Sequence, residues 1–551
     1  MRTPVTLFLL ALVVRLGLIA LFPDPAYPDS FYYVDVARAL ASGHGLNVDF
    51  VWIFAEVGNR IPANPTLPIP ANAHWLPLAS FLQAPFISVL GPTALASALP
   101  MALVGSLGAP LTWQIAREAG ARRLVANGAG ILAAIPAAGT VFMAQPENFA
   151  ILQPLVAATL LLVARGLKGD NRAFAVAGLL AGLASLARND GVLLFGAMGL
   201  VWFGDRVRWW RSRSGSRGWS HAAARPPIAL WAAIGSVVLF LVVMGPWWLR
   251  QLAVFGSISP TSSTGVALWI RNIAEWNSIT ADPSLATFLA QGPGPILASR
   301  LGGLLAALGN FAVVICSVIL VPFLLVGAAV RARSVDFAPW FVYAIVVFAG
   351  ATLLYPLHVP GGAFIHSAVG LEPHAYVLTI EGILALVGGI ARRRSTWRLD
   401  VAGPVFVGAI VALTVATAAF WALEVQRQWD TARQPRMALA RELDRMAVPR
   451  TDRLLSIDSA GMKYWTDRPG VVTPDDPIDT IEAVARAYGT RWLVLERDAA
   501  ARALAPVLVG QDARPAWIGA PVFSVPAAEG GAPRLALYPV CTVPGDTRCG
   551  P

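Results

Sequence analysis

The sequence contains few charged residues, and this scarcity restricts the class of protein it encodes. Only 13% of the 551 residues are Asp, Glu, Lys or Arg, whereas 56% are hydrophobic. A soluble fold cannot bury that much apolar surface, so the composition excludes an ordinary soluble protein and indicates a polytopic membrane protein. Lysine is almost missing, with only Lys168 and Lys463, and we interpret the preference for arginine as compositional bias.

Other features are also missing. The chain has no internal repeat, and its only low-complexity tract is the Arg/Ser/Gly-rich segment 206–225. No small-residue cleavage site separates the first apolar run from Pro23, so we expect an uncleaved anchor. Of the three cysteines, Cys316 lies in an apolar run and is expected in the core. Cys541 and Cys549 are close enough to form a small disulfide-closed loop, although two free thiols also fit.

The basic residues are concentrated in short segments between the apolar runs. A net charge of +10 can suggest a nucleic-acid partner. Short loops rich in Lys and Arg stay in the cytoplasm, however, so membrane topology accounts for the charge and we expect no nucleic acid. The residues that mark the predicted cytoplasmic side are Arg117, Arg122, Arg123, Arg165, Lys168, Arg172, Arg206, Arg208, Arg211, Arg213, Arg217, Arg225, Arg331, Arg333, Arg392, Arg393, Arg394 and Arg398.

Apolar runs of about 17–25 residues can cross a bilayer as helices. We predict about eleven such helices, with the N-terminus in the cytoplasm and the C-terminus outside the cytoplasmic membrane. The predicted spans lie near 4–22, 92–115, 124–143, 148–165, 173–188, 190–204, 228–249, 303–330, 338–357, 374–391 and 402–423.

The character of the chain changes after Gln426. Residues 426–551 are more charged and rich in proline, which predicts a small extracytoplasmic α/β domain after a membrane domain formed by residues 1–425. The runs 454–457 and 492–495 have the pattern of short buried strands. A helix is expected over 480–488, ending at Gly489.

The external loop 23–91 begins with the segment that we consider most informative. Its apolar and aromatic residues have helical spacing, which predicts an interfacial helix from near Asp29 to Gly43. Asp29 has two interpretations: it can cap this helix, or it can serve as a carboxylate at the membrane surface that a lipid-borne substrate reaches.

Four segments together resemble the GT-C glycosyltransferases, in particular the protein O-mannosyltransferase and lipid A aminoarabinose transferase superfamily. The first is the Asp29 segment after the first span. His74-Trp75-Leu76-Pro77-Leu78 resembles the superfamily's His-Pro-Pro-Leu segment, Gln145-Pro146-Glu147 resembles its second external acidic turn, and residues 178–191 resemble its Gly-Leu-Ala, Arg, acidic-Gly motif.

This resemblance covers residues 1–210 by motif and the later spans by topology only. Ser30 stands where the protein mannosyltransferases have Glu after Asp, and Trp75 interrupts the His-Pro-Pro pattern. The resemblance implies a GT-C membrane fold and a transferase. Such an enzyme moves one sugar from a polyprenyl-phosphate donor to an acceptor hydroxyl on the outer face of the cytoplasmic membrane, with inversion.

That reaction has two chemical requirements. An acceptor hydroxyl has a pKa far above 7, so it needs a carboxylate to take its proton, and Asp29 is the candidate base. The leaving phosphate needs positive charge, which an arginine or a divalent metal ion can supply, and no organic cofactor is expected. Arg188 is the candidate arginine, although an arginine at a span end can also be an interfacial anchor.

The other candidates belong to the predicted outer side. Glu147 is a lone acid at the mouth of a span, where the family resemblance favours a catalytic role over a solvated turn. Asp190 is a candidate for substrate binding, or simply part of an ordinary Asn-Asp-Gly turn. Tyr32, His74 and His366 are further candidates for substrate binding. The external histidines His74, His358, His366 and His374 lack metal-site spacing, and Gly361-Gly362 before His366 permits close approach of a ligand.

A membrane glycosyltransferase is therefore the function that the sequence favours. The alternative is a membrane transporter or lipid flippase. Transporters place polar, discontinuous elements at mid-membrane and often consist of repeated halves, whereas here the acids lie at the outer ends of spans. A third option is a structural or sensory membrane protein whose external domain carries the function. The sugar and the acceptor, which can be a protein, a lipid or a glycan, cannot be read from the residues.

Overall fold

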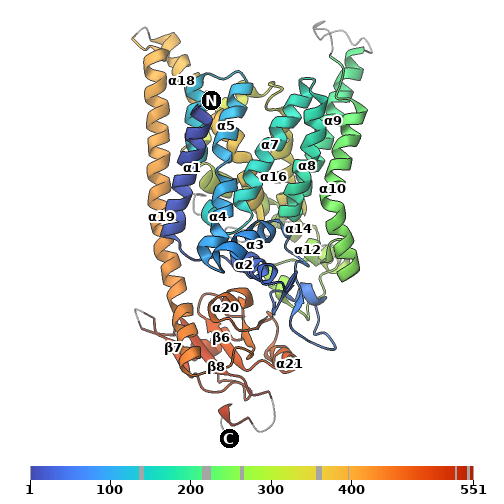
Figure 1. Cartoon of the computed structure of the whole chain (residues 1–551), viewed down its shortest axis with the longest axis vertical. Coiled ribbons are helices and arrows are strands. Elements are labelled where there is room, and N and C mark those ends of the chain that lie inside the picture. Colours follow the sequence, from blue (N-terminus) through green and yellow to red (C-terminus); the bar gives the residue numbers. More distant parts are fainter. Residues whose placement is uncertain are drawn as a thin grey trace.

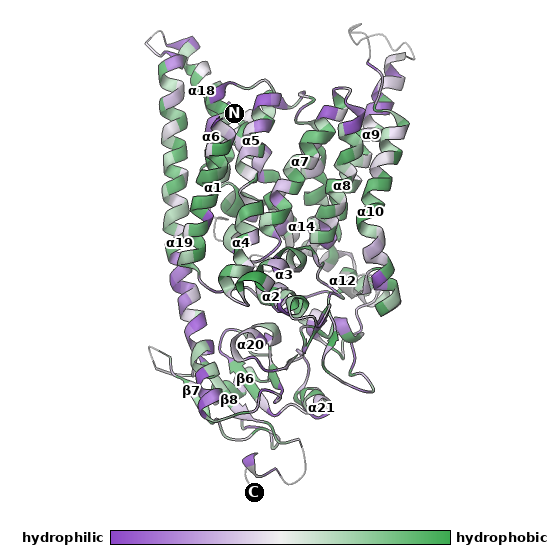
Figure 2. Ribbon diagram, in the orientation of Figure 1, coloured by the Kyte–Doolittle hydropathy of each residue, from purple (hydrophilic) through white to green (hydrophobic). Residues whose placement is uncertain are grey.

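A bundle of long helices and a smaller α/β body lie at opposite ends of the molecule (Figure 1). The computed structural model describes residues 2–135, 142–213, 225–260, 266–354, 363–394, 396–527, 530–542 and 546–549. The bundle is predominantly hydrophobic along its length, and polar residues gather at its ends and in the α/β body (Figure 2). This distribution agrees with the predicted class of multi-pass membrane protein. Arg217, His358, Gly361 and Gly362, which the sequence analysis singled out, lie outside the described residues.

Seven helical segments of the described chain are long and apolar enough to cross a membrane. Shorter apolar helices complete the bundle, so the number of eleven spans stays a prediction. The helices of the bundle are α1 (Arg2–Leu21), α4 (Ala94–Gly105), α5 (Gly108–Glu118), α6 (Arg123–Ala134), α7 (Phe149–Leu167), α8 (Asn171–Ala187), α9 (Val192–Arg213), α10 (Leu230–Phe255), α14 (Pro293–Asn310), α15 (Val321–Arg331), α16 (Ala338–Ala349), α17 (Ala363–Ala368), α18 (Glu372–Arg393) and α19 (Leu399–Arg445).

The prediction of one continuous span over 303–330 is wrong. A π-helical segment, η6 (Phe311–Ile315), follows α14, and α15 begins only at Val321. Between them, Ser317 and Val318 have φ angles of 46° and 60°. Two consecutive left-handed residues interrupt a right-handed helix, and no glycine in that stretch signals the break in the sequence.

The external loop forms a layer between the bundle and the α/β body (Figure 1). It contains α2 (Pro28–Ala41) and α3 (Leu78–Leu90), so the helix predicted from near Asp29 is confirmed, and its place at the membrane interface stays a prediction. Ser42 caps α2, and Gly43 follows with a φ of 82°. A short antiparallel pair, β1 (Asn47–Val48) with β3 (Ile69–Pro70), and the 3-10 turn η1 (Phe54–Val57) complete the loop.

The α/β body is built on a six-stranded sheet with the order β2-β5-β4-β6-β8-β7. The first four strands in this order, β2, β5, β4 and β6, pair in parallel. Strand β8 pairs antiparallel with both β6 and β7. The two predicted strands and the helix ending at Gly489, whose φ is 59°, are confirmed. The elements are β2 (Phe50–Val51), β4 (Leu454–Ser456), β5 (Gly470–Val472), β6 (Trp492–Glu496), β7 (Phe523–Val525), β8 (Leu535–Pro539), α20 (Ser459–Thr466), α21 (Ile478–Tyr488) and α22 (Ala505–Leu508).

Two elements join the body to the bundle. Helix α19 runs without interruption from the bundle into the body, so the predicted boundary at 425/426 falls inside this helix. Strand β2 comes from the external loop and forms an edge of the sheet beside β5. The Ser459 hydroxyl donates a hydrogen bond to the Val51 carbonyl at 2.7 Å, and Lys463 contacts Asp49 at 2.8 Å. Residues far apart in the sequence therefore share one core.

The remaining described elements connect these parts. Cys541 and Cys549 form a disulfide near the C-terminus, and Cys316 is buried as a free thiol. The N-terminus lies at the end of the bundle opposite the α/β body (Figure 1). The short connecting elements are η3 (Phe142–Ala144), η4 (Asn189–Gly191), α12 (Val266–Trp269), η5 (Ile273–Asn277), α13 (Leu285–Leu289), η7 (Gly350–Leu354), η8 (Val369–Leu371) and η9 (Thr547–Cys549).

Candidate functional site

The first turn of α2 presents Asp29 at the junction of the bundle and the α/β body. Tyr27 is the N-cap of this helix, with an extended backbone and no side-chain capping bond, and Pro28 occupies the first helical turn. Proline suits that position because its missing N–H would have no helical partner there. Asp29 is therefore the second helical residue, and the interpretation of Asp29 as the N-cap is wrong.

The turn before α7 presents Glu147. This turn is buried, with Glu147 1% exposed. Elements of the external loop hold it in place: Gln145 accepts a hydrogen bond from the Ala26 amide at 3.0 Å, and Gln83 donates to the Pro146 carbonyl at 3.1 Å. The Ser30 hydroxyl, next to Asp29, lies 3.5 Å from the carboxylate of Glu147. The external loop therefore brings the two acids together.

Arg188 follows the last residue of α8 and is nearly buried, with 9% of its surface exposed. Its guanidinium donates two hydrogen bonds to the Asp190 carboxylate, at 2.8 and 3.3 Å. The Ser367 hydroxyl donates to the same carboxylate, which links η4 to α17. An interfacial anchor would extend its guanidinium into the headgroups. Arg188 is instead fixed inside the protein, so the anchor interpretation is wrong, and Asp190 holds the arginine in position.

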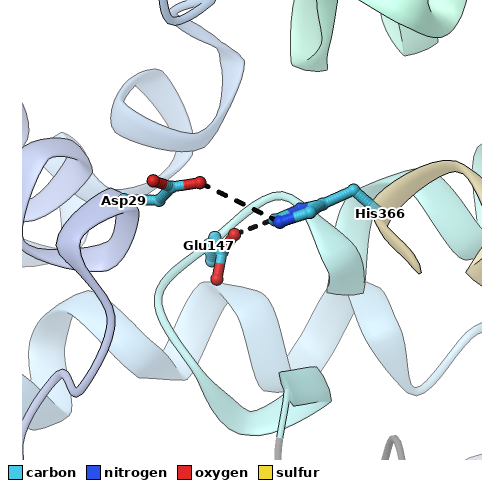
Figure 3. A group of neighbouring side chains, drawn as sticks. All are labelled: Asp29, Glu147 and His366. Carbon is cyan, nitrogen blue, oxygen red and sulfur yellow. Dashed lines mark ion pairs between the residues drawn. The ribbon is translucent and has the colours of Figure 1, made fainter. Parts of the chain in front are cut away.

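His366 comes from α17, on the far side of the cluster. Its ring stacks on Phe149 with the centroids 4.0 Å apart and the planes inclined by 16°. The Nδ1 atom lies 3.2 Å from Glu147 Oε1 and 3.3 Å from Asn148 Oδ1, and Nε2 lies 3.9 Å from Asp29 Oδ2 (Figure 3). The stacking fixes the ring plane, so both ring nitrogens face acidic or amide oxygens.

Asp29, Glu147 and His366 thus converge from three distant parts of the chain (Figure 3). One ligand atom of each lies within 4.8 Å of the others. Glu147 Oε1 accepts no hydrogen bond from any of the described residues. Two carboxylate oxygens, one of them this unsatisfied oxygen, and an imidazole nitrogen form a donor set that suits a divalent cation such as Mn²⁺ or Zn²⁺.

The charges of this site influence one another. Burial raises the pKa of Asp29, and the nearby Arg188 charge opposes that rise. Burial also raises the pKa of Glu147, the charge of Asp29 raises it further, and Arg188 again acts in the opposite direction. Two neighbouring carboxyls in a buried site resist ionising together. A carboxylate with a raised pKa is a stronger base, which suits the removal of a proton from a hydroxyl.

Two other sequence candidates have different surroundings. Tyr32 is fully buried, and its hydroxyl lies 3.2 Å from Glu56 and 2.7 Å from the Asn72 amide. His74 lies in an aromatic group and stacks near Trp52, and its carbonyl accepts a hydrogen bond from Asn189 at 2.8 Å. Burial lowers the pKa of His74 to about 3, so this ring is neutral at physiological pH. Both residues support the loop beside the acidic cluster.

The structure also brings in residues that the sequence analysis did not single out. The Asn148 side chain donates to the Tyr33 hydroxyl at 3.0 Å, and Phe149 stacks on His366. Ser367 binds Asp190. The sequence indicated these residues only by position, because each lies within two residues of a candidate residue.

Comparison with known proteins agrees with this arrangement. Residues 71–219 match the family model described as dolichyl-phosphate-mannose-protein mannosyltransferase. The whole chain superposes on the crystal structure of ArnT from Cupriavidus metallidurans in the apo state, with a TM-score of 0.55 and 14% identity over 99% of both chains. The fold is that of the GT-C glycosyltransferases.

A second solved structure of ArnT from Cupriavidus metallidurans, bound to undecaprenyl phosphate, is equally similar. Its TM-score is 0.54 and its identity 15%, over 99% of both chains. Among curated proteins, no sequence matches this chain. The segment that matches the family model contains His74, Glu147, Arg188 and Asp190, whereas Asp29 and His366 lie outside it. The resemblance inferred from motifs is confirmed at the level of the GT-C fold.

Proposed function

We propose that this protein is a membrane glycosyltransferase. It moves one sugar from a polyprenyl-phosphate donor to an acceptor hydroxyl on the outer face of the cytoplasmic membrane. The observation that carries the proposal is the convergence of Asp29, Glu147 and His366 within 4.8 Å, beside the buried Arg188. This cluster occupies the end of the bundle nearest the α/β body, where a lipid-borne donor and a water-borne or lipid-borne acceptor can meet.

The reaction is a single displacement. The acceptor oxygen attacks the anomeric carbon of the sugar while its proton passes to a carboxylate oxygen of Asp29. The bond between that carbon and the phosphate oxygen breaks, and its electron pair stays on the polyprenyl phosphate. Attack from the side opposite the phosphate inverts the anomeric carbon. Asp29 is the base because it is the more exposed acid of the cluster, with 19% of its side chain accessible.

The departing phosphate gains negative charge as the bond breaks, so the site must supply positive charge. Arg188 provides a fixed guanidinium, oriented by its two contacts with Asp190. Glu147 and His366, with Asp29 at the edge, would hold a divalent cation, which when bound supplies further positive charge to the phosphate. Glu147 and His366 are the closer pair, at 3.2 Å. Arg188 and such a cation would act on the leaving phosphate, whereas Asp29, the more distant acid at 3.9 Å from His366, would take the acceptor proton.

The donor class is supported by the ArnT structure that contains undecaprenyl phosphate in the same fold. We infer that the same kind of polyprenyl phosphate binds here, with its phosphate at the cluster and its chain in the bilayer. The N-terminus is then cytoplasmic and the α/β body extracytoplasmic, as the arginine distribution predicts.

Mass spectrometry of lipids that co-purify with the full-length protein tests this proposal most directly. We expect a polyprenyl phosphate or its glycosylated form, enriched over an unrelated membrane protein purified from the same cells. Proteoliposomes supplied with the identified donor should then release polyprenyl phosphate. If no polyprenyl-phosphate species is enriched and no donor is consumed, the protein is not such a transferase.

A further inference from the structure

A cavity of about 300 Å³ lies where the bundle meets the α/β body. Its walls come from the segment joining α1 to α2, from residues 426–436 of α19, from Ile457 and Asp458 just before α20, and from Trp465 near the end of α20. This volume is at the lower end of the range for small-molecule sites, ~300–1,000 Å³. The cavity is therefore suited to a small group rather than to a polymer.

The charged side chains of the walls leave no surplus positive charge. Asp24, Asp430, Asp458, Arg433 and Arg436 line the cavity, which gives three carboxylates against two guanidiniums and a net charge of −1. Both guanidiniums are already paired: Arg433 lies 2.7 Å from Asp24 and 3.0 Å from Asp430, and Arg436 lies 2.6 Å from Asp458. An anionic ligand would meet more negative than positive charge here, so the walls disfavour phosphate and carboxylate groups.

Unused hydrogen-bond donors remain in the same walls. Arg433 Nε and Trp465 Nε1 are buried and have no hydrogen-bond partner in the part of the chain that the structure describes. A buried donor without a partner costs about 1–3 kcal/mol, so such donors favour a ligand that brings acceptor oxygens. The carboxylates of Asp24 and Asp458 in turn accept hydrogen bonds. A suitable ligand therefore both donates and accepts.

Aromatic rings provide the rest of the surface. Phe31, Trp429 and Trp465 all line the cavity. Trp429 is held edge-on against Phe22 and Tyr27, with ring centroids 4.2 and 5.2 Å apart. Aromatic rings combine a broad apolar face with little loss of side-chain freedom on binding. Rings and paired charged groups together match the apolar C–H faces and the hydroxyl edges of a sugar.

We propose that this cavity is the acceptor subsite and that it takes an uncharged carbohydrate group. The inference rests on the proposed function, which requires an acceptor hydroxyl near Asp29. Pro28 and Phe31, on either side of Asp29 in α2, both line the cavity. The wall residue Asp458 is also close enough for its charge to act on Asp29. Asp29 itself is not a wall residue, but the cavity borders the helical turn that carries it, so a sugar in the cavity lies beside the proposed base.

Binding of matched neutral and charged sugars to the full-length protein in phosphatidylcholine nanodiscs tests this inference. The probes are methyl α-mannoside, methyl β-glucoside and cellobiose on one side, and mannose 6-phosphate and glucose 6-phosphate on the other. Saturation-transfer NMR reports weak binding. We expect at least one neutral probe to bind and its phosphorylated counterpart to bind at least tenfold more weakly.

The Trp465→Phe variant keeps the ring but removes the N–H donor, so it should weaken binding of the neutral probe ~3–10-fold. Trp517→Phe is the matched control, because the Trp517 N–H is also buried without a partner but does not line this cavity. If the melting temperature of Trp465→Phe is lower than that of the Trp517→Phe control, Trp429→Phe serves as a second cavity variant.

Three results would overturn the inference: binding of none of the neutral probes, equal or tighter binding of the phosphorylated sugars, or unchanged binding in both cavity variants. Loss of the proposed function has a different signature. It appears as absence of donor turnover in the unmodified protein, whatever the sugar probes do. The two failures can therefore be distinguished.

Discussion

Two groups of buried polar residues in this protein have similar chemistry and different surroundings. The outer cluster, formed by Asp29, Glu147 and His366, lies at the junction with the α/β body. An inner cluster lies inside the bundle, where Gln153 on α7 donates a hydrogen bond to Glu372 on α18. The charge of Arg15 on α1 also acts on Glu372.

The inner cluster is deeper in the bundle. Gln153 lies within α7, whereas Glu147 precedes that helix, and Glu372 begins α18, six residues after His366. Arg15 donates to main-chain carbonyls of Ala11 and Ala134 at 3.3 and 3.4 Å. The contact with Ala134 joins α1 to α6. We infer that the outer cluster serves chemistry and that the inner cluster holds helices together, so burial of charge alone does not identify a catalytic site.

The largest expected effect comes from Asp29→Asn in the outer cluster. Asparagine keeps the size of the side chain but cannot take the acceptor proton, so sugar transfer should fall ~10²–10⁴-fold. Donor binding and melting temperature should remain close to those of the unmodified protein. Transfer in proteoliposomes and a thermal-shift assay measure these quantities.

Asp35→Asn is the matched control on the same helix. Burial raises the pKa of Asp35 to about 8, with Arg38 opposing the rise. A carboxyl whose folded pKa is raised keeps its proton below that pKa, so near pH 7 this side chain is mostly neutral and asparagine imitates it. Transfer by the control should change less than threefold. Full activity of Asp29→Asn would refute the assignment of Asp29 as the base. It would also contradict the inference that the outer cluster serves chemistry and the inner cluster does not.

Arg188→Ala should produce the next largest effect. Loss of a fixed positive group beside the leaving phosphate should lower the rate of transfer ~10²–10³-fold. Arg165→Ala is the control, because Arg165 also contacts an acid, Glu118, at 2.9 Å but lies in the last turn of α7, far from Glu147 at the start of that helix. Steady-state kinetics measure the rate of transfer by both variants. Equal rates would show that Arg188 does not contribute to catalysis.

Cation binding should depend on the outer cluster alone. Glu147→Gln removes the negative charge of one ligand, and His366→Gln removes the imidazole nitrogen, so each should weaken Mn²⁺ or Zn²⁺ binding at least ~10–100-fold. Isothermal titration and elemental analysis of the purified protein measure the bound metal. His44→Gln, in the exposed part of the external loop, should bind the metal as the unmodified protein does. Retention of the metal by both cluster variants would refute the assigned ligands.

The smallest effect on activity is expected from Arg15→Met in the inner cluster. Methionine fills the space but cannot donate to the carbonyl of Ala134 or balance Glu372, and leaving such buried groups uncompensated costs about 1–3 kcal/mol. The melting temperature and the yield in membranes should fall, whereas the rate of transfer per folded molecule should stay within twofold. A stable Arg15→Met protein without transfer would show that the inner cluster has a role in the reaction.

Local signals in the sequence determined much of this structure. The apolar runs located the helices of the bundle, because only a helix satisfies its own backbone in lipid. The helical spacing after Asp29 gave α2, and Gly489, which adopts the left-handed backbone that glycine tolerates, gave the end of α21. These signals operate over one or two helical turns, so they can be read without knowledge of the packing.

Tertiary packing decided the rest. Glu147 and His366 are more than 200 residues apart, and only the docking of α17 against the start of α7 brings them to 3.2 Å. Ser367 on the same helix α17 also donates to Asp190, the local partner of Arg188. Pairing across the α/β body placed β2 in a sheet otherwise formed by residues after 450. Asp29, Glu147, Arg188 and His366 were nominated from residue types, sidedness and the resemblance to a known superfamily. Their assembly depended on contacts between segments distant in the sequence, which no local pattern encodes.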